Sequence, residues 1–272
     1  MLVLAISPHL DDAVLSAGGR WGQLGAEGAD VRVYTVFAGI AGPPFSPAAR
    51  GLHDLWSLGD QDVVRHRRAE DRTALELLGA APIHGPFLDG VYRRTADGRW
   101  LVDEKGQLLA QAPDERQLRE DVSAAVRDLV RELDPALVLT CAAVGSHIDH
   151  VLARDAVLSA VTDRRVECWE DMPYGQRRPL PTPERHLRLA APYPVVVERA
   201  SWRAKLAAVD CYRSQHRMLW PRDPEVGPRF DEAAGERAAA FGVDGPVEVF
   251  WPCLPPTSST EGDAARSGRD AE

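Results

Sequence analysis

Short, almost wholly apolar runs alternate along the chain with longer segments in which apolar residues recur at helical spacing. Continuous apolar runs are typical of strands that are buried on both faces of a parallel sheet. Such runs lie at residues 2–6, 31–38 and 136–142. Helical spacing is found at residues 13–19, 62–79, 114–133, 151–158 and 202–212. This order predicts an α/β fold in which a mostly parallel sheet is flanked by helices on both faces.

The remaining segments complete a single predicted domain over residues 1–254. Further strands are expected at residues 83–92, 165–174 and 247–251, and a pair of short strands at 187–197. Between the elements we expect an irregular proline-rich loop at 39–59, a hairpin at 93–113 and a short helix within 221–245. Residues 255–272 are rich in Ser, Thr, Gly and charged side chains, so they are predicted to form a disordered tail.

Polar side chains with metal-binding chemistry follow the first apolar run. His9, Asp11 and Asp12 lie between the predicted strand and the predicted helix, where open α/β sheets place their ligands. An imidazole and a carboxylate on one tight turn suit a zinc ion that keeps a position open for water. For this cluster alone a simpler interpretation stays open, in which an aspartate caps the helix and His9 is a polar loop residue.

A second cluster repeats this arrangement later in the chain. His147, Asp149 and His150 follow the apolar run at 136–142 and precede another helical segment. In a right-handed doubly wound sheet both clusters open onto the same edge. Three ligands contributed by two loops are typical of a catalytic zinc site rather than a closed structural one.

The two clusters together resemble a known family. Ser-Pro-His-Leu-Asp-Asp-Ala at residues 7–13 and Gly-Ser-His-Ile-Asp-His at 145–150 are similar to the motifs of the PIG-L/LmbE-like zinc-dependent de-N-acetylases. The resemblance implies a Rossmann-like fold in which Zn²⁺ is held by His9, Asp12 and His150. The commoner motif has Pro and Glu where this chain has Leu and Ala, and neither departure falls on a ligand.

The resemblance also implies an activity and its catalytic residues. Asp11 would be the general base, and His147 would lie beside the reacting carbonyl as an imidazolium. We expect Asp149 to hold His147 in one tautomer and to keep it charged. The reaction would be hydrolysis of an N-acetyl group on an amino sugar, in a small glycoconjugate of a thiol, antibiotic or other secondary-metabolite pathway. The acceptor, the acyl group and the native metal (zinc, iron or manganese) stay open.

Four residues outside the two clusters are expected to contact the substrate. Arg68 and Glu70 belong to an Arg-Arg-x-Glu-Asp segment, and Tyr174 to a Glu-Asp-Met-Pro-Tyr segment, which both resemble segments of the family. Asp89 follows a predicted strand and would line the same sheet edge. A turn aspartate before a glycine explains Asp89 equally well. His216 lies outside both clusters and is expected to be structural.

Charge and cysteine content narrow the expected partners to a small molecule. The chain has 41 Asp and Glu against 32 Lys and Arg, so its net charge of -9 argues against nucleic-acid binding. Four cysteines without a Cys-x-x-Cys motif argue against a zinc ribbon or a disulfide framework, and Cys141 and Cys168 are expected to be buried thiols. No apolar run approaches the ~20 residues of a membrane span, so we expect a cytoplasmic location and no membrane partner. The sequence leaves open whether the protein forms a homo-oligomer.

Three other functions are weighed against the hydrolase. A catalytically silent Rossmann-like module that binds a sugar or nucleotide is the main alternative, although every residue that hydrolysis requires is present. A serine hydrolase would need a Gly-x-Ser-x-Gly motif, which the chain lacks. A dinucleotide enzyme would need Gly-x-Gly-x-x-Gly after the first strand, where this chain has histidine and aspartate.

Overall fold

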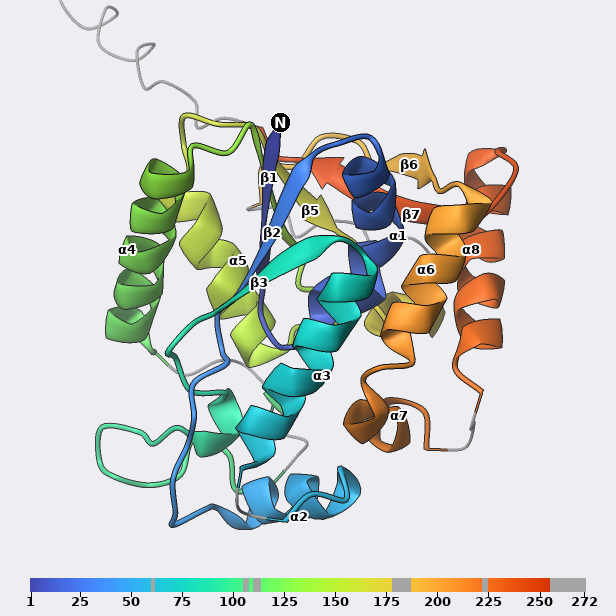
Figure 1. The fold of residues 1–272 in the computed structure, drawn as a ribbon. Helices are drawn as coiled ribbons and strands as arrows, with labels where there is room; N and C mark the ends of the chain where they lie inside the picture. The colour runs from blue at the N-terminus through green and yellow to red at the C-terminus, as the bar shows by residue number, and fades with distance from the viewer. Residues whose placement is uncertain (60–61, 105–107, 110–113, 178–186, 222–224, 255–272) are drawn as a thin grey trace, which may run out of the picture.

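A seven-stranded sheet forms the centre of the molecule in the computed structural model, which describes residues 1–59, 62–104, 108–109, 114–177, 187–221 and 225–254 (Figure 1). The strand order is β3-β2-β1-β4-β5-β7-β6. Five strands run parallel: β1 (Leu2–Ser7), β2 (Asp30–Thr35), β3 (Ala80–His84), β4 (Leu137–Cys141) and β5 (Val166–Trp169). The last two pair antiparallel at one edge: β7 (Val247–Pro252) and β6 (Tyr193–Val196). The predicted α/β fold with a mostly parallel sheet is confirmed.

Helices cover both faces of this sheet (Figure 1). One face carries α4 (Arg116–Leu133) and α5 (Ile148–Ala160). The other face carries α1 (Asp12–Ala26), α3 (Val63–Leu77), α6 (Arg199–Val209) and α8 (Gly227–Phe241). Beyond the carboxyl ends of the parallel strands lie α2 (Pro47–Leu55), α7 (Arg213–Leu219) and two short 3₁₀ helices, η1 (Gly90–Tyr92) and η3 (Tyr174–Arg177).

The apolar run of β1 supplies side chains to two separate cores. Val3 and Ala5 pack in the core beneath α1 and α6, whereas Leu4 and Ile6 pack in the core beneath α4 and α5. Successive side chains of a strand point to opposite faces, so a strand in the middle of a covered sheet needs apolar residues at every position. This requirement explains why the run is continuous rather than alternating.

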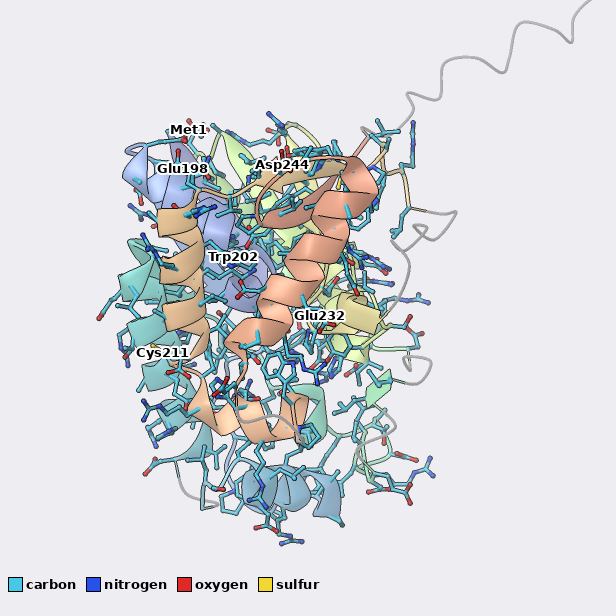
Figure 2. All side chains as sticks on the ribbon, turned by 90° about the vertical axis from the view of Figure 1, so that its right-hand side faces the viewer. Met1, Glu198, Trp202, Cys211, Glu232 and Asp244 are labelled. Atoms are coloured by element: carbon cyan, nitrogen blue, oxygen red, sulfur yellow. The ribbon has the colours of Figure 1, made fainter. Side chains whose placement is uncertain are left out.

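The helix that follows β1 packs very closely against its neighbours. A Cβ atom at Gly19 would lie 2.9 Å from a methyl group of Val197, so only glycine fits at this position. The carboxylate of Glu248 on β7 accepts hydrogen bonds from the Gly19 backbone N–H and from Lys205 Nζ, at 2.9 and 2.7 Å. On the same side of the molecule α6 and α8 lie side by side, with Trp202 between them (Figure 2). These contacts fix α1, and with α1 the residues at its first turn.

Three sequence predictions of local structure are wrong. The third strand spans residues 80–84 rather than lying within 83–92, and the Gly85 N–H that follows it still donates to Thr35 O at 2.7 Å. The loop at 39–59 contains α2, whose start has a recognisable signal: Ser46 caps it and Pro47 is its first residue. In place of a pair of strands at 187–197, the described part of this segment has β6 and an isolated bridge.

The structure also bears on the predictions for the cysteines, the C-terminal residues and membrane-spanning segments. Cys141 and Cys168 are buried free thiols, as expected. The predicted disordered tail, residues 255–272, lies outside the described residues. None of the helices in the described part of the chain combines the length and hydropathy that a membrane span requires.

Candidate active site

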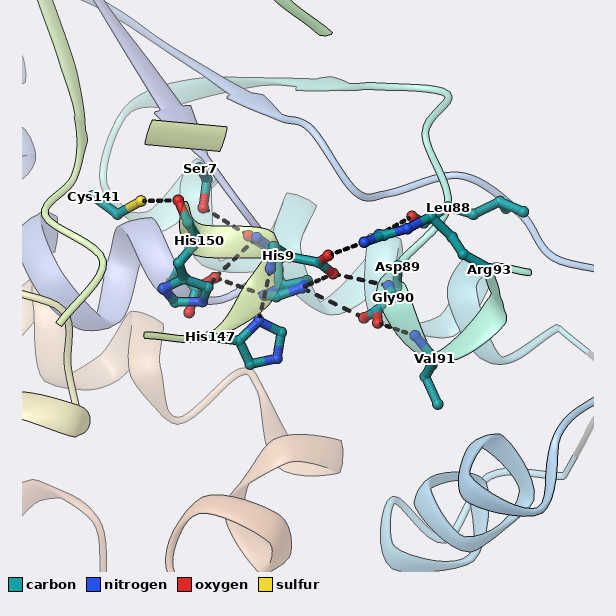
Figure 3. A network of polar contacts seen from close by, with 12 residues as sticks. Ser7, His9, Leu88, Asp89, Gly90, Val91, Arg93, Cys141, His147 and His150 are labelled. Carbon is teal, nitrogen blue, oxygen red and sulfur yellow. Dashed lines mark hydrogen bonds and ion pairs between the residues drawn. The ribbon is translucent and has the colours of Figure 1, made fainter. Parts of the chain in front are cut away.

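The two polar clusters meet at the carboxyl ends of β1 and β4 (Figure 3). One carboxylate oxygen, Oδ2 of Asp12, lies 3.0 Å from Nδ1 of His9 and 3.1 Å from Nε2 of His150. All three side chains are buried. The expectation that both clusters open onto one edge of the sheet is therefore confirmed.

The turn from β1 into α1 is held by its own polar side chains. Ser7 Oγ donates to the His9 carbonyl at 2.7 Å and accepts from the Ala13 N–H at 3.2 Å. The Asp12 carboxylate accepts from the His9 backbone N–H at 2.9 Å. Asp11 occupies the N-cap position of α1, but its side chain makes no capping hydrogen bond. Capping therefore does not explain Asp11.

The turn from β4 into α5 requires unusual backbone conformations. Ala143, Gly145 and Ser146 have φ values of 60°, 92° and 58°, in the left-handed region. For residues other than glycine this conformation costs roughly 1 to 3 kcal/mol and is concentrated at functional sites. The turn makes His147 the N-cap of α5, where its Nδ1 accepts from the Asp149 backbone N–H at 3.2 Å.

That hydrogen bond determines the protonation of His147. Because Nδ1 is an acceptor, the proton of the neutral ring is on Nε2. Burial lowers the pKa of His147 well below its usual value, and His9 and His150 lower it further. The expected imidazolium at His147 is therefore wrong for this structure, which contains a neutral ring with one N–H donor.

The Asp149 carboxylate orients a different histidine from the one expected. Its Oδ2 lies 3.0 Å from His9 Nε2 and accepts from the Gly90 N–H at 2.8 Å, while Oδ1 lies 2.7 Å from Arg93 (Figure 3). Burial opposes its charge, but Arg93 and His9 hold the pKa of Asp149 far below its usual range. The prediction that this carboxylate holds His147 is wrong, because the first turn of α5 directs it towards β1.

Asp171, which follows β5, does for His150 what Asp149 does for His9. Its Oδ1 lies 2.8 Å from His150 Nδ1, and its Oδ2 accepts from the Val144 N–H at 2.9 Å. The sequence analysis missed Asp171, although it stands in the segment that supplied Tyr174. Its position at the carboxyl end of a parallel strand could have identified it as a candidate site residue.

This pattern fits a bound metal ion. Each of His9 and His150 directs one ring N–H to an outer carboxylate and its other nitrogen to Asp12. Without a metal, an imidazole held between two carboxylates takes up a second proton, and a cation bound to one ring nitrogen would replace that proton; outer carboxylates of this kind accompany most metal-bound histidines. Burial lowers the pKa of His150, but Asp12 and Asp171 outweigh it and raise that pKa to about 9, so the site attracts positive charge. Ligand atoms of His9, His147 and His150 lie within 4.8 Å of one another, so this group could hold a divalent metal.

Asp11 lies beside this cluster with a basic partner. Its Oδ1 lies 3.2 Å from a guanidinium nitrogen of Arg67, and both side chains are buried. Burial and the charge of Asp12 raise the pKa of Asp11 to about 6, although Arg67 opposes the shift. A carboxylate that titrates near neutral pH suits proton transfer.

A pocket of about 470 Å³ opens onto these groups. It is lined by His9, Asp11, Asp12 and His147, and also by Asp89 and Tyr174, which the sequence analysis expected near the substrate. Asp89 also accepts from the Val91 N–H at 3.1 Å, as a turn aspartate would. The ring of Tyr174 meets His150 edge-on, with 5.5 Å between centroids.

A family model described as "PIG-L: GlcNAc-PI de-N-acetylase" matches residues 4–161, which include both clusters. The chain belongs to the PIG-L family.

Relatives of this PIG-L protein include two curated deacetylases. The 2'-N-acetylparomamine deacetylase of Streptomyces fradiae is 30% identical over 69% of this chain and 62% of its own length. The 1D-myo-inositol 2-acetamido-2-deoxy-alpha-D-glucopyranoside deacetylase of Rhodococcus erythropolis is 30% identical over 80% of this chain and 69% of its own. A solved structure, a zinc-inhibited form of a teicoplanin deacetylase, is 39% identical with a TM-score of 0.84, covering 95% of this chain and all of the other.

Two residues expected to contact substrate have other roles in this PIG-L protein. Arg68 donates to the carbonyls of Ala38 and Gly85 at 2.8 and 3.2 Å, and so ties together the loops after β2 and β3. Glu70 accepts from the Ser214 backbone N–H and hydroxyl at 2.9 and 2.5 Å, and so anchors α7. Neither side chain lines the pocket.

The arginine that does line the pocket is the preceding one, Arg67. The buried positions of α3 include Val63, Arg67, Asp71 and Ala74, which recur at helical spacing. The helical phase of these residues, rather than the motif, is the signal that identifies Arg67. His216, expected to be structural, lies 3.1 Å from the Val209 carbonyl and outside the pocket lining.

Proposed function

We propose that this chain is a zinc-dependent N-deacetylase that hydrolyses the acetamide of an N-acetylated amino sugar in a small glycoconjugate. The observation that supports it best is the arrangement at Asp12: two imidazoles, each in contact with an outer carboxylate, direct their other ring nitrogens to it beside the buried acid Asp11. Membership of the PIG-L family and the deacetylase names of its relatives point to the same reaction.

His9, Asp12 and His150 would hold the metal, since together they offer two ring nitrogens and one carboxylate, and His9 and Asp12 line the pocket. Zinc bound there would supply Lewis-acid polarisation of the amide carbonyl and would make a water molecule more acidic. Asp149 and Asp171 fix the two imidazoles in the tautomers that binding requires.

Asp11 transfers the proton that hydrolysis moves. As a carboxylate it takes a proton from the attacking water, and as an acid it gives that proton to the nitrogen of the breaking C–N bond, so acetate and the amine are released. Its pKa of about 6 makes both protonation states accessible near neutral pH. Arg67 holds the carboxylate in place and favours its anionic form.

His147 stabilises the charge that develops on the carbonyl oxygen. Its Nδ1 is occupied by the Asp149 N–H, so its Nε2–H is the donor available to the pocket that His147 lines. A neutral donor aimed at the oxyanion needs no proton of its own to be gained or lost during turnover.

Amine release from N-acetylated sugar conjugates tests the proposal. The protein is stripped of metal, reconstituted with one equivalent of zinc, iron or manganese, and compared with an Asp11→Asn variant. Stoichiometric metal is used because a related deacetylase has been crystallised in a zinc-inhibited form. We expect amine release that depends on metal and on Asp11. Binding of the conjugates without any release would instead identify a silent sugar-binding module. The cytoplasmic location stays a prediction.

A further inference from the structure

We propose that Cys168 and Cys253 form a modification site, at which an oxidant of the peroxide class converts the two thiols into an intrachain disulfide. Both cysteines are free in this structure, and their sulfur atoms lie 3.6 Å apart. A disulfide bond is ~2.05 Å long, so the sulfurs have to approach by about 1.5 Å, which rotation about the Cα–Cβ bonds can supply. The deacetylase reaction uses neither thiol, so this site does not depend on the proposed function.

Strand pairing brings the two cysteines together, although 85 positions separate them in the chain. β5 and β7 pair antiparallel, and the Cys253 N–H, just past the end of β7, donates to the Val166 carbonyl of β5 at 2.9 Å. Cys253 therefore lies opposite Val166, which precedes Cys168 by two positions in the same strand. Alternate residues of a strand share one face of the sheet, so the two thiols lie on the same face.

The two thiols differ in their access to solvent. Cys168 is fully buried, whereas Cys253 is half-buried and lines a pocket of about 540 Å³ at the amino end of β5. This pocket, which Val161 and Arg188 also line, shares no described residue with the catalytic pocket at the other end of the strands. The contact with Cys253 and burial raise the pKa of Cys168 well above its usual value, so Cys168 stays protonated. A small oxidant therefore reacts first with Cys253.

The oxidation takes place in two steps. The Cys253 sulfur attacks one oxygen of hydrogen peroxide, the O–O bond breaks, and a sulfenic acid and one water molecule are formed. The Cys168 sulfur then attacks the Cys253 sulfur, and the S–O bond breaks. The leaving hydroxide takes the Cys168 proton and becomes the second water molecule. The two thiols together lose two electrons, which the peroxide gains, and a small thiol can reverse the change by attacking the disulfide.

The disulfide ties the end of β7 to β5 and closes a long loop of the chain. This loop contains β6, α6, α7 and α8. A cross-link of this kind restricts the unfolded chain and so stabilises the folded state. We therefore expect the oxidised protein to have a Tm about 5 to 15 °C higher than that of the reduced protein.

Peroxide treatment of a Cys211→Ser protein tests the proposal. Cys211 is a half-buried thiol that follows α6, and a serine there can keep its hydrogen bond to the Ala207 carbonyl (Figure 2). This parent protein retains three of the four cysteines: Cys141, Cys168 and Cys253. Hydrogen peroxide should leave one of them titratable in the denatured protein. Peptide mapping without reductant should find Cys168 joined to Cys253, and dithiothreitol should restore every thiol and the original Tm.

Two further variants of this parent separate the roles of the thiols. In Cys168→Ala the Cys253 sulfenic acid has no thiol to react with, so dimedone should label Cys253 in this variant and not in the parent. Cys253→Ser should form no disulfide and gain no stability. Because this change is at a half-buried position at the end of the sheet, it keeps the test decisive even if Cys168→Ala does not fold.

Three results would overturn the proposal. The first is a parent protein that keeps all its thiols while the same peroxide oxidises its methionines. The second is a disulfide between Cys141 and Cys168. The third is a disulfide that still forms in Cys253→Ser. Amine release is not measured in these experiments, so their outcome does not depend on the deacetylase activity.

Discussion

The Asp149 carboxylate lies 3.0 Å from Nε2 of His9, so a residue of the second cluster orients the histidine of the first. The reverse contact also exists, because Asp12 of the first cluster lies 3.1 Å from His150 of the second. The two clusters therefore form one interlocked unit, and a change in either is expected to alter metal binding by the other.

The outer carboxylates should control metal affinity without contacting the metal. Asp149→Asn and Asp171→Asn leave an acceptor for each imidazole but remove its charge, so we expect metal affinity to fall ~10- to 100-fold. Competition with a chromophoric chelator measures it. Asp128→Asn, an exposed aspartate on α4, is the control and should retain wild-type affinity. Unchanged affinity in all three proteins would show that the outer contacts are only structural.

Substitution of the proposed ligand histidines should lower the metal content, whereas substitution of a structural histidine should not. His9→Ala and His150→Ala each remove one nitrogen from the set around Asp12, so most bound metal should be lost. His216→Ala removes a contact to the Val209 carbonyl and should leave the metal content unchanged. Elemental analysis gives the metal content, and circular dichroism shows whether each variant is folded. Equal metal in three folded variants would exclude the proposed ligand set.

Substitutions of the adjacent residues Asp11 and Asp12 should impair different properties of the protein. Asp12→Ala should lose metal, because it removes the carboxylate that both imidazoles face. Asp11→Asn should keep the metal and the fold but lose the proton acceptor, which usually costs ~100- to 10,000-fold in rate. Metal content and steady-state amine release are measured on the same preparations. Loss of metal from Asp11→Asn together with full metal in Asp12→Ala would reverse the two roles.

The neutral donor at His147 should be replaceable by another neutral donor. His147→Ala should keep the metal and lower kcat by ~100-fold or more, as expected for removal of one oxyanion donor. His147→Gln retains an N–H donor on a side chain of similar reach and should recover part of that loss. If His147 acted as an imidazolium, the glutamine variant would be as inactive as the alanine variant and the alkaline limb of the pH profile would move.

The burial of Asp11 should cost stability in the metal-free protein. Its pKa is about 6 in the folded chain against an ordinary value of 3.8, so the folded state holds the proton more tightly than the unfolded state does. The free energy of unfolding therefore falls as pH rises from 3.8 through 6, and then levels off. Asp11→Asn should be more stable than wild type at pH 7 to 8, by on the order of 2 to 3 kcal/mol, with no gain near pH 4. Urea unfolding in the presence of a chelator measures both; a gain that is constant with pH would have another origin.

Sequence patterns could predict the features that depend on residues close together in the chain. The continuous run of β1, the polar turn after it and the repeat of this unit at β4 are local features, and they indicated that His9, Asp12 and His150 lie together. What the patterns could not supply was the direction of side chains across the site. Asp149 follows His147 closely in sequence, yet its carboxylate points to His9 because Gly90 and Arg93 approach from another segment.

The motif around Arg67 and Arg68 likewise does not show which side chain faces the pocket. Both arginines are in the shared segment, and composition cannot choose between them. Only the buried face of α3, set by Val63, Asp71 and Ala74, selects Arg67 for the pocket. Asp171 could have been predicted, because it follows a parallel strand. The contacts of Arg68 could not, because the two carbonyls that accept from it belong to loops that only the complete fold brings together.

The central place of β1 has a consequence for synthesis on the ribosome. This strand is made well before β4 (Leu137–Cys141), with which it pairs on one side. Until β4 emerges, one edge of the most apolar strand has unpaired backbone groups, which are a template for pairing with other chains. His9 and Asp12 likewise precede His150 and Asp171 by most of the domain. Chains interrupted before β4 should therefore aggregate and be wholly inactive, rather than retain part of the activity.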